Sequence, residues 1–101
     1  MVSKLSDTER STHLPKLEQQ GWKLVQGRDA LTKTYTFSDF NAAWGFMSRI
    51  ALKADKVDHH PEWFNVYNRV EITWSTHECQ GLSERDLGMV AFCEEIAPQK
   101  N

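Results

Sequence analysis

Cysteine, proline and glycine are all scarce in this sequence of 101 residues, which contains two cysteines, three prolines and five glycines. The two cysteines, Cys79 and Cys93, show no C-x-x-C or paired spacing, which argues against a disulfide scaffold. Reduced thiols are typical of a cytosolic protein. Cys79 lies two residues after His77, so a reactive thiol is one interpretation, and a thiol without a role is the simpler one.

Long apolar runs and clusters of basic residues are missing as well. The longest mostly apolar stretch, residues 40–52, contains Asn41, Ser48 and Arg49 and is too short to span a bilayer. The first residues lack the apolar core of a signal peptide. The net charge is −2, and lysines and arginines are scattered among acidic residues, whereas phosphate binding needs clustered cations. We therefore expect a soluble protein that binds neither membranes nor nucleic acid directly.

The composition fits a single domain over residues 1–101, with 40% hydrophobic and 26% charged residues and no internal repeat or linker. A chain of this length buries only about two thirds of the surface that its unfolded form exposes. It has little room for both a deep core and an enclosed site, and self-association would help to provide both.

The first third of the sequence predicts a helix followed by a hairpin. Residues 6–9, with the sequence Ser-Asp-Thr-Glu, form a capping box that opens the helix, and Gly21 ends it. Pro15 removes a hydrogen-bond donor inside this segment, so we expect a kink or two short helical pieces. Residues 22–26 and 31–37 predict two paired strands, because the second segment alternates apolar or aromatic residues with threonines.

Residues 40–56 predict a long helix, capped by Ser38 or Asp39, whose apolar surface is wide. Trp44 and Ala51 extend the stripe well beyond a single core-facing band. A helix that is apolar over most of its circumference needs two partners, and we expect these to be its own sheet and the same helix of another subunit. The core-facing stripe consists of Phe40, Ala43, Met47, Ile50 and Ala54.

The second half predicts two more strands and a helix. Pro61 disfavours helical geometry at His60, so the long helix should end before it. Residues 62–68 and 70–75 predict strands joined by a tight turn at residues 68–69, and Ser83 caps a final helix that carries Leu87, Val90, Ala91 and Ile96. The fold class is therefore α+β: a four-stranded antiparallel sheet with three helices packed on one face.

Three of the four histidines lie next to the second pair of strands. His59 and His60 come just before it and His77 just after it, so antiparallel pairing would bring all three to one end of the sheet, near Asp55 and Asp58. Histidine titrates near pH 6.5, and a cluster can hold proton donors and acceptors together at neutral pH. Chemistry in which one group removes a proton and another supplies one would suit this cluster.

Other interpretations of this corner remain open. Three histidines and a carboxylate could bind zinc, although the side chains of adjacent histidines diverge, and unreactive surface histidines are equally compatible with the pattern. A serine nucleophile is not indicated, because no glycine elbow surrounds Ser75 or Thr76. Asp86 could be part of a helix cap only. Core packing is the simplest interpretation of the nearby aromatic residues, which could also form a wall for a flat ligand: Trp63, Phe64, Tyr67 and Trp74.

The spacing of these residues resembles that of the pterin-4a-carbinolamine dehydratase family, also called dimerisation cofactor. The pattern is Asp55, His59-His60-Pro61, Tyr67, His77 and Asp86, and residues 58–68 and 75–86 strengthen the match, which covers residues 5–97. The resemblance implies dehydration of 4a-hydroxytetrahydrobiopterin to quinonoid dihydrobiopterin and water, without any cofactor or metal, in recycling of tetrahydrobiopterin for aromatic amino-acid hydroxylases.

The resemblance also implies roles for individual residues. His59, His60 and His77 match the catalytic histidines, with His59 and His77 as the proton-transfer pair and His60 orienting the pterin. Asp55 and Asp86 match supporting acidic positions. The substrate-binding positions are Asp58, His59, His60, Pro61, Trp63, Ser75, Thr76, His77 and Glu78.

The family forms homotetramers, dimers of dimers that pack through the helix at residues 40–56. Some animal relatives use this surface to bind the dimerisation helices of hepatocyte nuclear factor, a homeodomain transcription factor. The resemblance therefore implies a cytoplasmic protein that could also enter the nucleus, and it adds a helix-binding coactivator as an alternative function.

Overall fold

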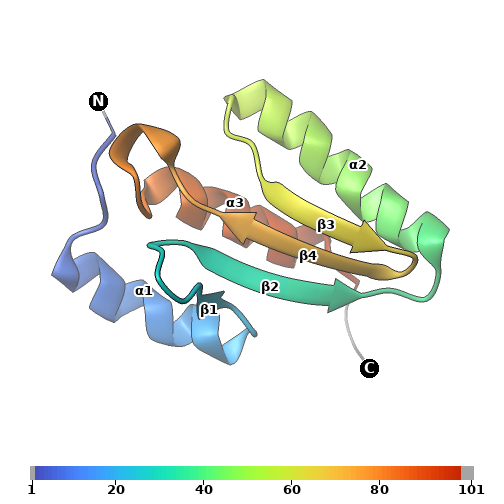
Figure 1. Ribbon diagram of the computed structural model, residues 1–101, viewed down its shortest axis with the longest axis horizontal. Helices are drawn as coiled ribbons and strands as arrows, with labels where there is room; N and C mark the ends of the chain where they lie inside the picture. Colours follow the sequence, from blue (N-terminus) through green and yellow to red (C-terminus); the bar gives the residue numbers. More distant parts are fainter. Residues whose placement is uncertain (1, 99–101) are drawn as a thin grey trace.

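The computed structural model describes residues 2–98 and has the α+β fold that the sequence predicts: three α-helices and a four-stranded antiparallel sheet in the order α-β-β-α-β-β-α (Figure 1). No helix in this part of the chain combines the length and apolar composition needed to cross a membrane. The elements are α1 (Asp7–Gln19), β1 (Lys23–Leu24), β2 (Leu31–Thr36), α2 (Phe40–Val57), β3 (Glu62–Val66), β4 (Arg69–Trp74), a 3-10 turn η1 (His77–Cys79) and α3 (Glu84–Ile96).

The strand order is β1-β2-β4-β3, and every neighbouring pair is antiparallel. One face of β4 carries Val70, Ile72 and Trp74, which are completely buried and lie beneath α2 and α3. The opposite face is more polar, and Thr73 donates a hydrogen bond to Thr32 of β2 there (2.9 Å). Both predicted hairpins are confirmed. β3 and β4 are the pair that brings the segments before and after them to one end of the sheet.

The local predictions fail at two places. α1 is one continuous helix through Pro15 rather than two short pieces, and Ser11, whose carbonyl would accept the missing N–H, is an exposed residue where water can bind instead. The β3–β4 turn comprises Tyr67 and Asn68, one residue earlier than predicted. Tyr67 adopts a left-handed conformation (φ 49°), and Asn68 donates a side-chain hydrogen bond to the carbonyl of Phe37, so contacts with a distant loop select this turn.

Glu94 of α3 connects the helix layer to the sheet. Its Oε2 accepts hydrogen bonds from Trp22 Nε1 (3.2 Å), Lys33 Nζ (2.6 Å) and the Tyr35 hydroxyl. Burial and the bond to Glu94 both raise the pKa of Tyr35. Because the donors come from the start of β1 and from β2, this one carboxylate holds three segments together.

Replacing Glu94 with Gln should lower the free energy of unfolding by about 1–3 kcal/mol, because the amide removes the charge that pairs with Lys33 and one acceptor position. Urea denaturation of the variant and of the unmodified protein measures this loss. Glu95→Gln, at an exposed position of the same helix, is the control and should change stability by less than about 0.5 kcal/mol. Equal midpoints for the two variants would contradict the role of Glu94.

Candidate functional site

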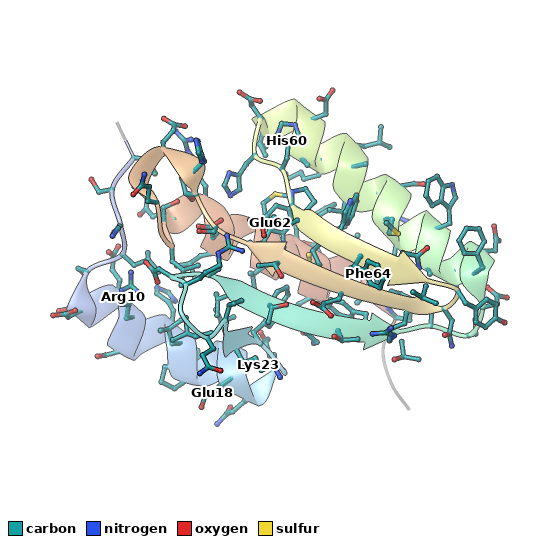
Figure 2. All side chains as sticks on the ribbon, viewed as in Figure 1. Arg10, Glu18, Lys23, His60, Glu62 and Phe64 are labelled. Atoms are coloured by element: carbon teal, nitrogen blue, oxygen red, sulfur yellow. The ribbon has the colours of Figure 1, made fainter. Side chains whose placement is uncertain are left out.

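The three predicted histidines lie at the same end of the β3–β4 hairpin. α2 ends at Asp58, whose left-handed backbone (φ 55°) turns the chain so that His59 and His60 lead into β3. His77 begins η1, three residues after β4 ends at Trp74. Figure 2 shows His60, Glu62 and Phe64 following one another from the end of α2 along β3. The structure therefore brings the histidines together as antiparallel pairing requires.

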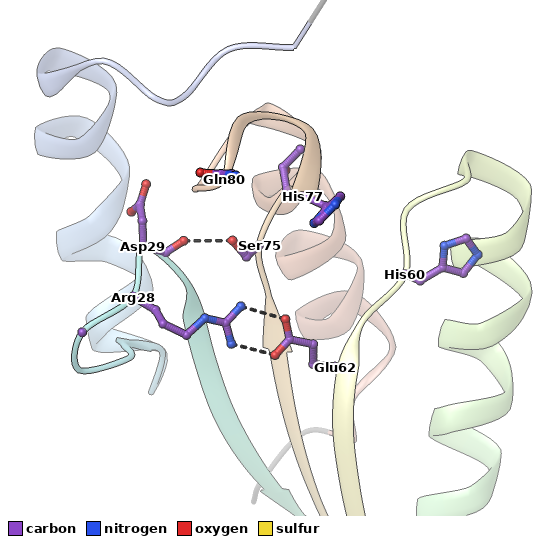
Figure 3. Close-up of a pocket in the computed structure, with 9 residues that line it drawn as sticks. Arg28, Asp29, His60, Glu62, Ser75, His77 and Gln80 are labelled. Atoms are coloured by element: carbon purple, nitrogen blue, oxygen red, sulfur yellow. Dashed lines mark hydrogen bonds and ion pairs between the residues drawn. The ribbon is translucent and has the colours of Figure 1, made fainter.

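Two cavities adjoin at this corner. One, of about 210 Å³, is lined by all three histidines: its walls are Asp58, His59, His60, Ser75, Thr76, His77, Glu78 and Arg85. The other, of about 470 Å³, is shown in Figure 3 and is lined by Gly27, Arg28, Asp29, His60, Glu62, Ser75, Thr76, His77 and Gln80. The smaller is called the histidine cavity below and the larger the Arg28 cavity. They share His60, Ser75, Thr76 and His77, so a ligand beside these residues can reach into both.

His59 is held by a buried carboxylate. Its Nε2 lies 2.6 Å from Asp86 Oδ1, and the two side chains are 8% and 0% exposed. Because a carboxylate only accepts hydrogen bonds, Nε2 must carry the proton of the neutral ring. The other ring nitrogen, Nδ1, is then left with a lone pair and is the atom of His59 that is free for a ligand.

Asp86 is itself fixed by donors on its second oxygen. Oδ2 accepts hydrogen bonds from the Thr76 hydroxyl (2.7 Å) and from the backbone N–H of Ser83 (3.0 Å). The bond to Ser83 completes the capping box of α3, so Asp86 caps the helix and also binds His59. The His59 ring stacks on Trp74, with centroids 5.7 Å apart and planes 20° apart. These contacts leave the imidazole little freedom to rotate.

His60 and His77 are exposed, in contrast to His59. Asp55 Oδ1 lies 3.9 Å from His60 Nε2, and its side chain is 92% exposed, so this contact contributes little to orienting the ring. Glu78 forms an exposed ion pair with Arg85 (2.5 Å), and the Arg85 guanidinium lowers the pKa of Glu78. Within the described residues 2–98, no group of three or more His, Cys, Asp or Glu side chains is placed to hold a metal ion.

The predicted binding residues separate into two groups. Asp58, Ser75, Thr76 and Glu78 line the histidine cavity. Pro61 and Trp63 line instead a neighbouring groove beside α2, which His60 also borders. Phe64 and Tyr67 lie farther along the hairpin and are exposed, whereas Trp74 is completely buried against His59.

Asp29 positions the loop that carries His77, and no sequence pattern identifies this role. Its Oδ2 accepts a hydrogen bond from the N–H of Leu82 (3.0 Å), and its backbone carbonyl accepts one from Ser75 (3.0 Å). Arg10 of α1 binds the same carboxylate through two nitrogens (2.7 and 2.8 Å) and holds the pKa of Asp29 below its usual value. A Cβ at Gly81 would lie 2.3 Å from Asp29 Oδ2, so any larger residue there would displace this carboxylate from its partners. These partners are 19 to 53 residues apart, and no periodic pattern links them.

The family model and the related proteins found by comparison all point to the same family. The family model for Pterin 4 alpha carbinolamine dehydratase matches residues 3–96. Two curated bacterial proteins carry the name "Putative pterin-4-alpha-carbinolamine dehydratase". That of Paraburkholderia xenovorans (strain LB400) is 52% identical over 95% of this chain and 98% of its own length. That of Burkholderia multivorans (strain ATCC 17616 / 249) is 53% identical over 96% of this chain and 93% of its own.

A solved structure agrees with these relatives. The crystal structure of a transcriptional coactivator/pterin dehydratase from Brucella melitensis superposes with a TM-score of 0.86 at 45% sequence identity. The match covers 94% of this chain and 99% of that one.

Asp86 should determine which nitrogen of His59 carries the proton. Nitrogen-15 NMR at alkaline pH should find Nε2–H in the unmodified protein. In Asp86→Asn the amide can donate to Nε2, so the proton should move to Nδ1. Asp55→Asn, which changes an exposed carboxylate near His60, should leave the tautomer of His59 unchanged. Finding Nδ1–H in the unmodified protein would contradict the assignment.

Proposed function

This chain belongs to the pterin-4a-carbinolamine dehydratase family, and on that premise we propose that it is a hydro-lyase that removes water from 4a-hydroxytetrahydropterins by histidine acid–base catalysis. The observation that carries the mechanism is that three imidazoles line one cavity and one of them is locked onto a buried carboxylate. His59, His60 and His77 are the proposed catalytic residues.

The reaction needs two proton movements and no electron transfer. The C4a–O bond breaks, and the hydroxyl leaves as water after it receives a proton. The proton on N5 is removed, and the electron pair of the N5–H bond forms the C4a=N5 double bond. The protons balance, so one group must give a proton and another must take one, each within hydrogen-bond reach of the pterin.

His59 suits the role of base. Its Nδ1 lone pair is available because Nε2 donates to Asp86, and the carboxylate stabilises the imidazolium that forms when N5 gives up its proton. His77 suits the role of acid, since its exposed ring can exchange protons with solvent and then protonate the leaving hydroxyl. His60, which borders both cavities, is the group that we propose to orient the pterin ring.

In cellular terms, the proposed role is recycling. Aromatic amino-acid hydroxylases release 4a-hydroxytetrahydrobiopterin, and loss of water returns it to quinonoid dihydrobiopterin, which can then be reduced. The same product forms slowly without a catalyst, so the enzyme would act by shortening the life of the carbinolamine. The free thiols of Cys79 and Cys93 are compatible with a cytosolic setting.

Replacing His59 and His77 together with Ala should reduce the catalysed rate at least about 100-fold and bring carbinolamine decay close to the uncatalysed rate, because both proton-transfer groups are lost. Stopped-flow absorbance of freshly formed 4a-hydroxytetrahydropterin, with and without protein, measures the decay. His13→Ala, at an exposed position of α1, is the matched control and should keep full activity. Unchanged turnover in the double variant would rule out the mechanism.

We also propose a homotetramer, a dimer of dimers, built through α2. The core side of this helix buries Ala43, Phe46, Met47, Ile50 and Ala54. Its other side leaves Trp44 55% and Leu52 75% exposed, which is unusual for large apolar side chains on a lone chain. The same surface supports a second candidate function, binding of a partner's dimerisation helices as a coactivator, since an amphipathic helix would also cover it.

A charge at the centre of this surface should separate the subunits. Ala51→Glu should lower the mass measured by light scattering from that of a tetramer to that of a smaller species, because an unpaired carboxylate would be buried between helices. Ala91→Glu, at an exposed position of α3, is the control and should leave the mass unchanged. A monomeric mass for the unmodified protein would contradict the proposed assembly.

A further inference from the structure

The Arg28 cavity is crossed by an ion pair that the proposed chemistry does not use. Arg28 lies in the turn between β1 and β2, and Glu62 is the first residue of β3. In the sheet, β4 lies between β2 and β3, so the pair spans the end of β4 beside Ser75 (Figure 3). Both bonds, Nη1–Oε1 and Nη2–Oε2, are 2.7 Å long. Both Nη atoms of the guanidinium therefore bind the same carboxylate.

This pairing offsets the positive charge of Arg28 in the cavity. The Glu62 carboxylate raises the pKa of Arg28, and the guanidinium lowers the pKa of Glu62, so both groups stay ionised and neutralise each other. The remaining fixed charge in the lining is Asp29, which faces Arg10 from outside the cavity. The cavity therefore has no unpaired arginine or lysine for an anion.

Besides His60 and His77, the groups that remain available are those that bind hydroxyls. Ser75 and Gln80 offer neutral donors and acceptors, and each oxygen of Glu62 keeps a lone pair after it binds Arg28. A phosphate or carboxylate in the same place would lose its hydration without meeting an unpaired arginine or lysine, and burial of an unpaired charge opposes binding.

The position of the Arg28 cavity suits it to the C6 substituent of a pterin. On the proposed mechanism, C4a and N5 must lie in the histidine cavity, because His59 lines that cavity and does not line the Arg28 cavity. C6 is bonded directly to N5, so its substituent starts beside the residues that border both cavities. The substituent can then extend past His60 and His77 into the larger space.

We propose that the Arg28–Glu62 pair is a specificity determinant that makes the Arg28 cavity accept neutral, hydroxylated C6 substituents of the pterin and reject anionic ones. The inference rests on the proposed function and deepens it. Neither residue is a proton-transfer group, and their effect is on which pterin binds. Discrimination depends on the pairing itself, since removal of Glu62 leaves the arginine free to bind an anion bidentately.

A matched pair of ligands tests this directly: 7,8-dihydroneopterin and its 3′-phosphate, which differ only by the phosphate group on the C6 substituent. Titration calorimetry at fixed, low salt should show that the unmodified protein binds the neutral ligand more tightly by about tenfold or more, a modest electrostatic difference. Glu62→Gln should reduce or reverse that ratio by at least about tenfold, because it frees Arg28. Arg28→Gln should widen the ratio, since it leaves the Glu62 carboxylate uncompensated.

The double variant Arg28→Gln/Glu62→Gln should fall between the two single variants, and Glu95→Gln should match the unmodified protein. Equal binding of both ligands to the unmodified protein, or an unchanged ratio in Glu62→Gln, would overturn the specificity role. If the unmodified protein accelerates carbinolamine decay while Glu62→Gln leaves the ratio unchanged, only this inference fails. If it binds neither ligand and does not accelerate decay, the proposed function fails with it.

Discussion

The contact on which the rest of the site depends is the hydrogen bond between His59 and the buried carboxylate of Asp86. A buried carboxylate is costly unless every lone pair is used, and here the donors come from an imidazole, a threonine hydroxyl and a helix-capping N–H. The same atoms therefore fix the start of α3, the end of β4 and the orientation of a histidine. The hydrogen bonds of Asp86 serve both stability and the proposed proton transfer, so a substitution in this network affects both.

The sequence predicts the parts of this arrangement that follow from periodicity and chain order. Alternation in residues 31–37 and the wide apolar stripe of residues 40–56 identify elements that the structure contains, and hairpin pairing is sufficient to bring His77 beside His59. Predictions from local sequence failed where a distant residue or a water molecule decides the backbone conformation. Water can satisfy the carbonyl that Pro15 leaves without a donor, and Asn68 forms its turn by binding Phe37. Membership of the family, predicted from the histidine motif, is confirmed.

The hydrogen bonds and ion pairs around the two cavities could not be predicted from periodicity and chain order. Asp86 was interpreted from its spacing to Ser83 as part of a helix cap, which is correct, but a cap signal contains no information about a histidine 27 residues away. Asp29 and the Arg28–Glu62 pair unite residues that are close only after the sheet has formed. Charged residues are common in turns, and the tertiary fold determines which of them form ion pairs, so the local sequence does not reveal the partner.

The stacking of Trp74 on His59 has a consequence for how the site can be observed. A protonated imidazole in contact with an indole ring quenches its fluorescence by accepting an electron from the excited state, whereas a neutral imidazole does so weakly. Trp74 is completely buried, so solvent contributes little to its emission. The protein thus carries an indole ring beside the residue proposed to take up the proton, and the part of its fluorescence that comes from Trp74, as distinct from Trp22, Trp44 and Trp63, would follow the charge of that ring.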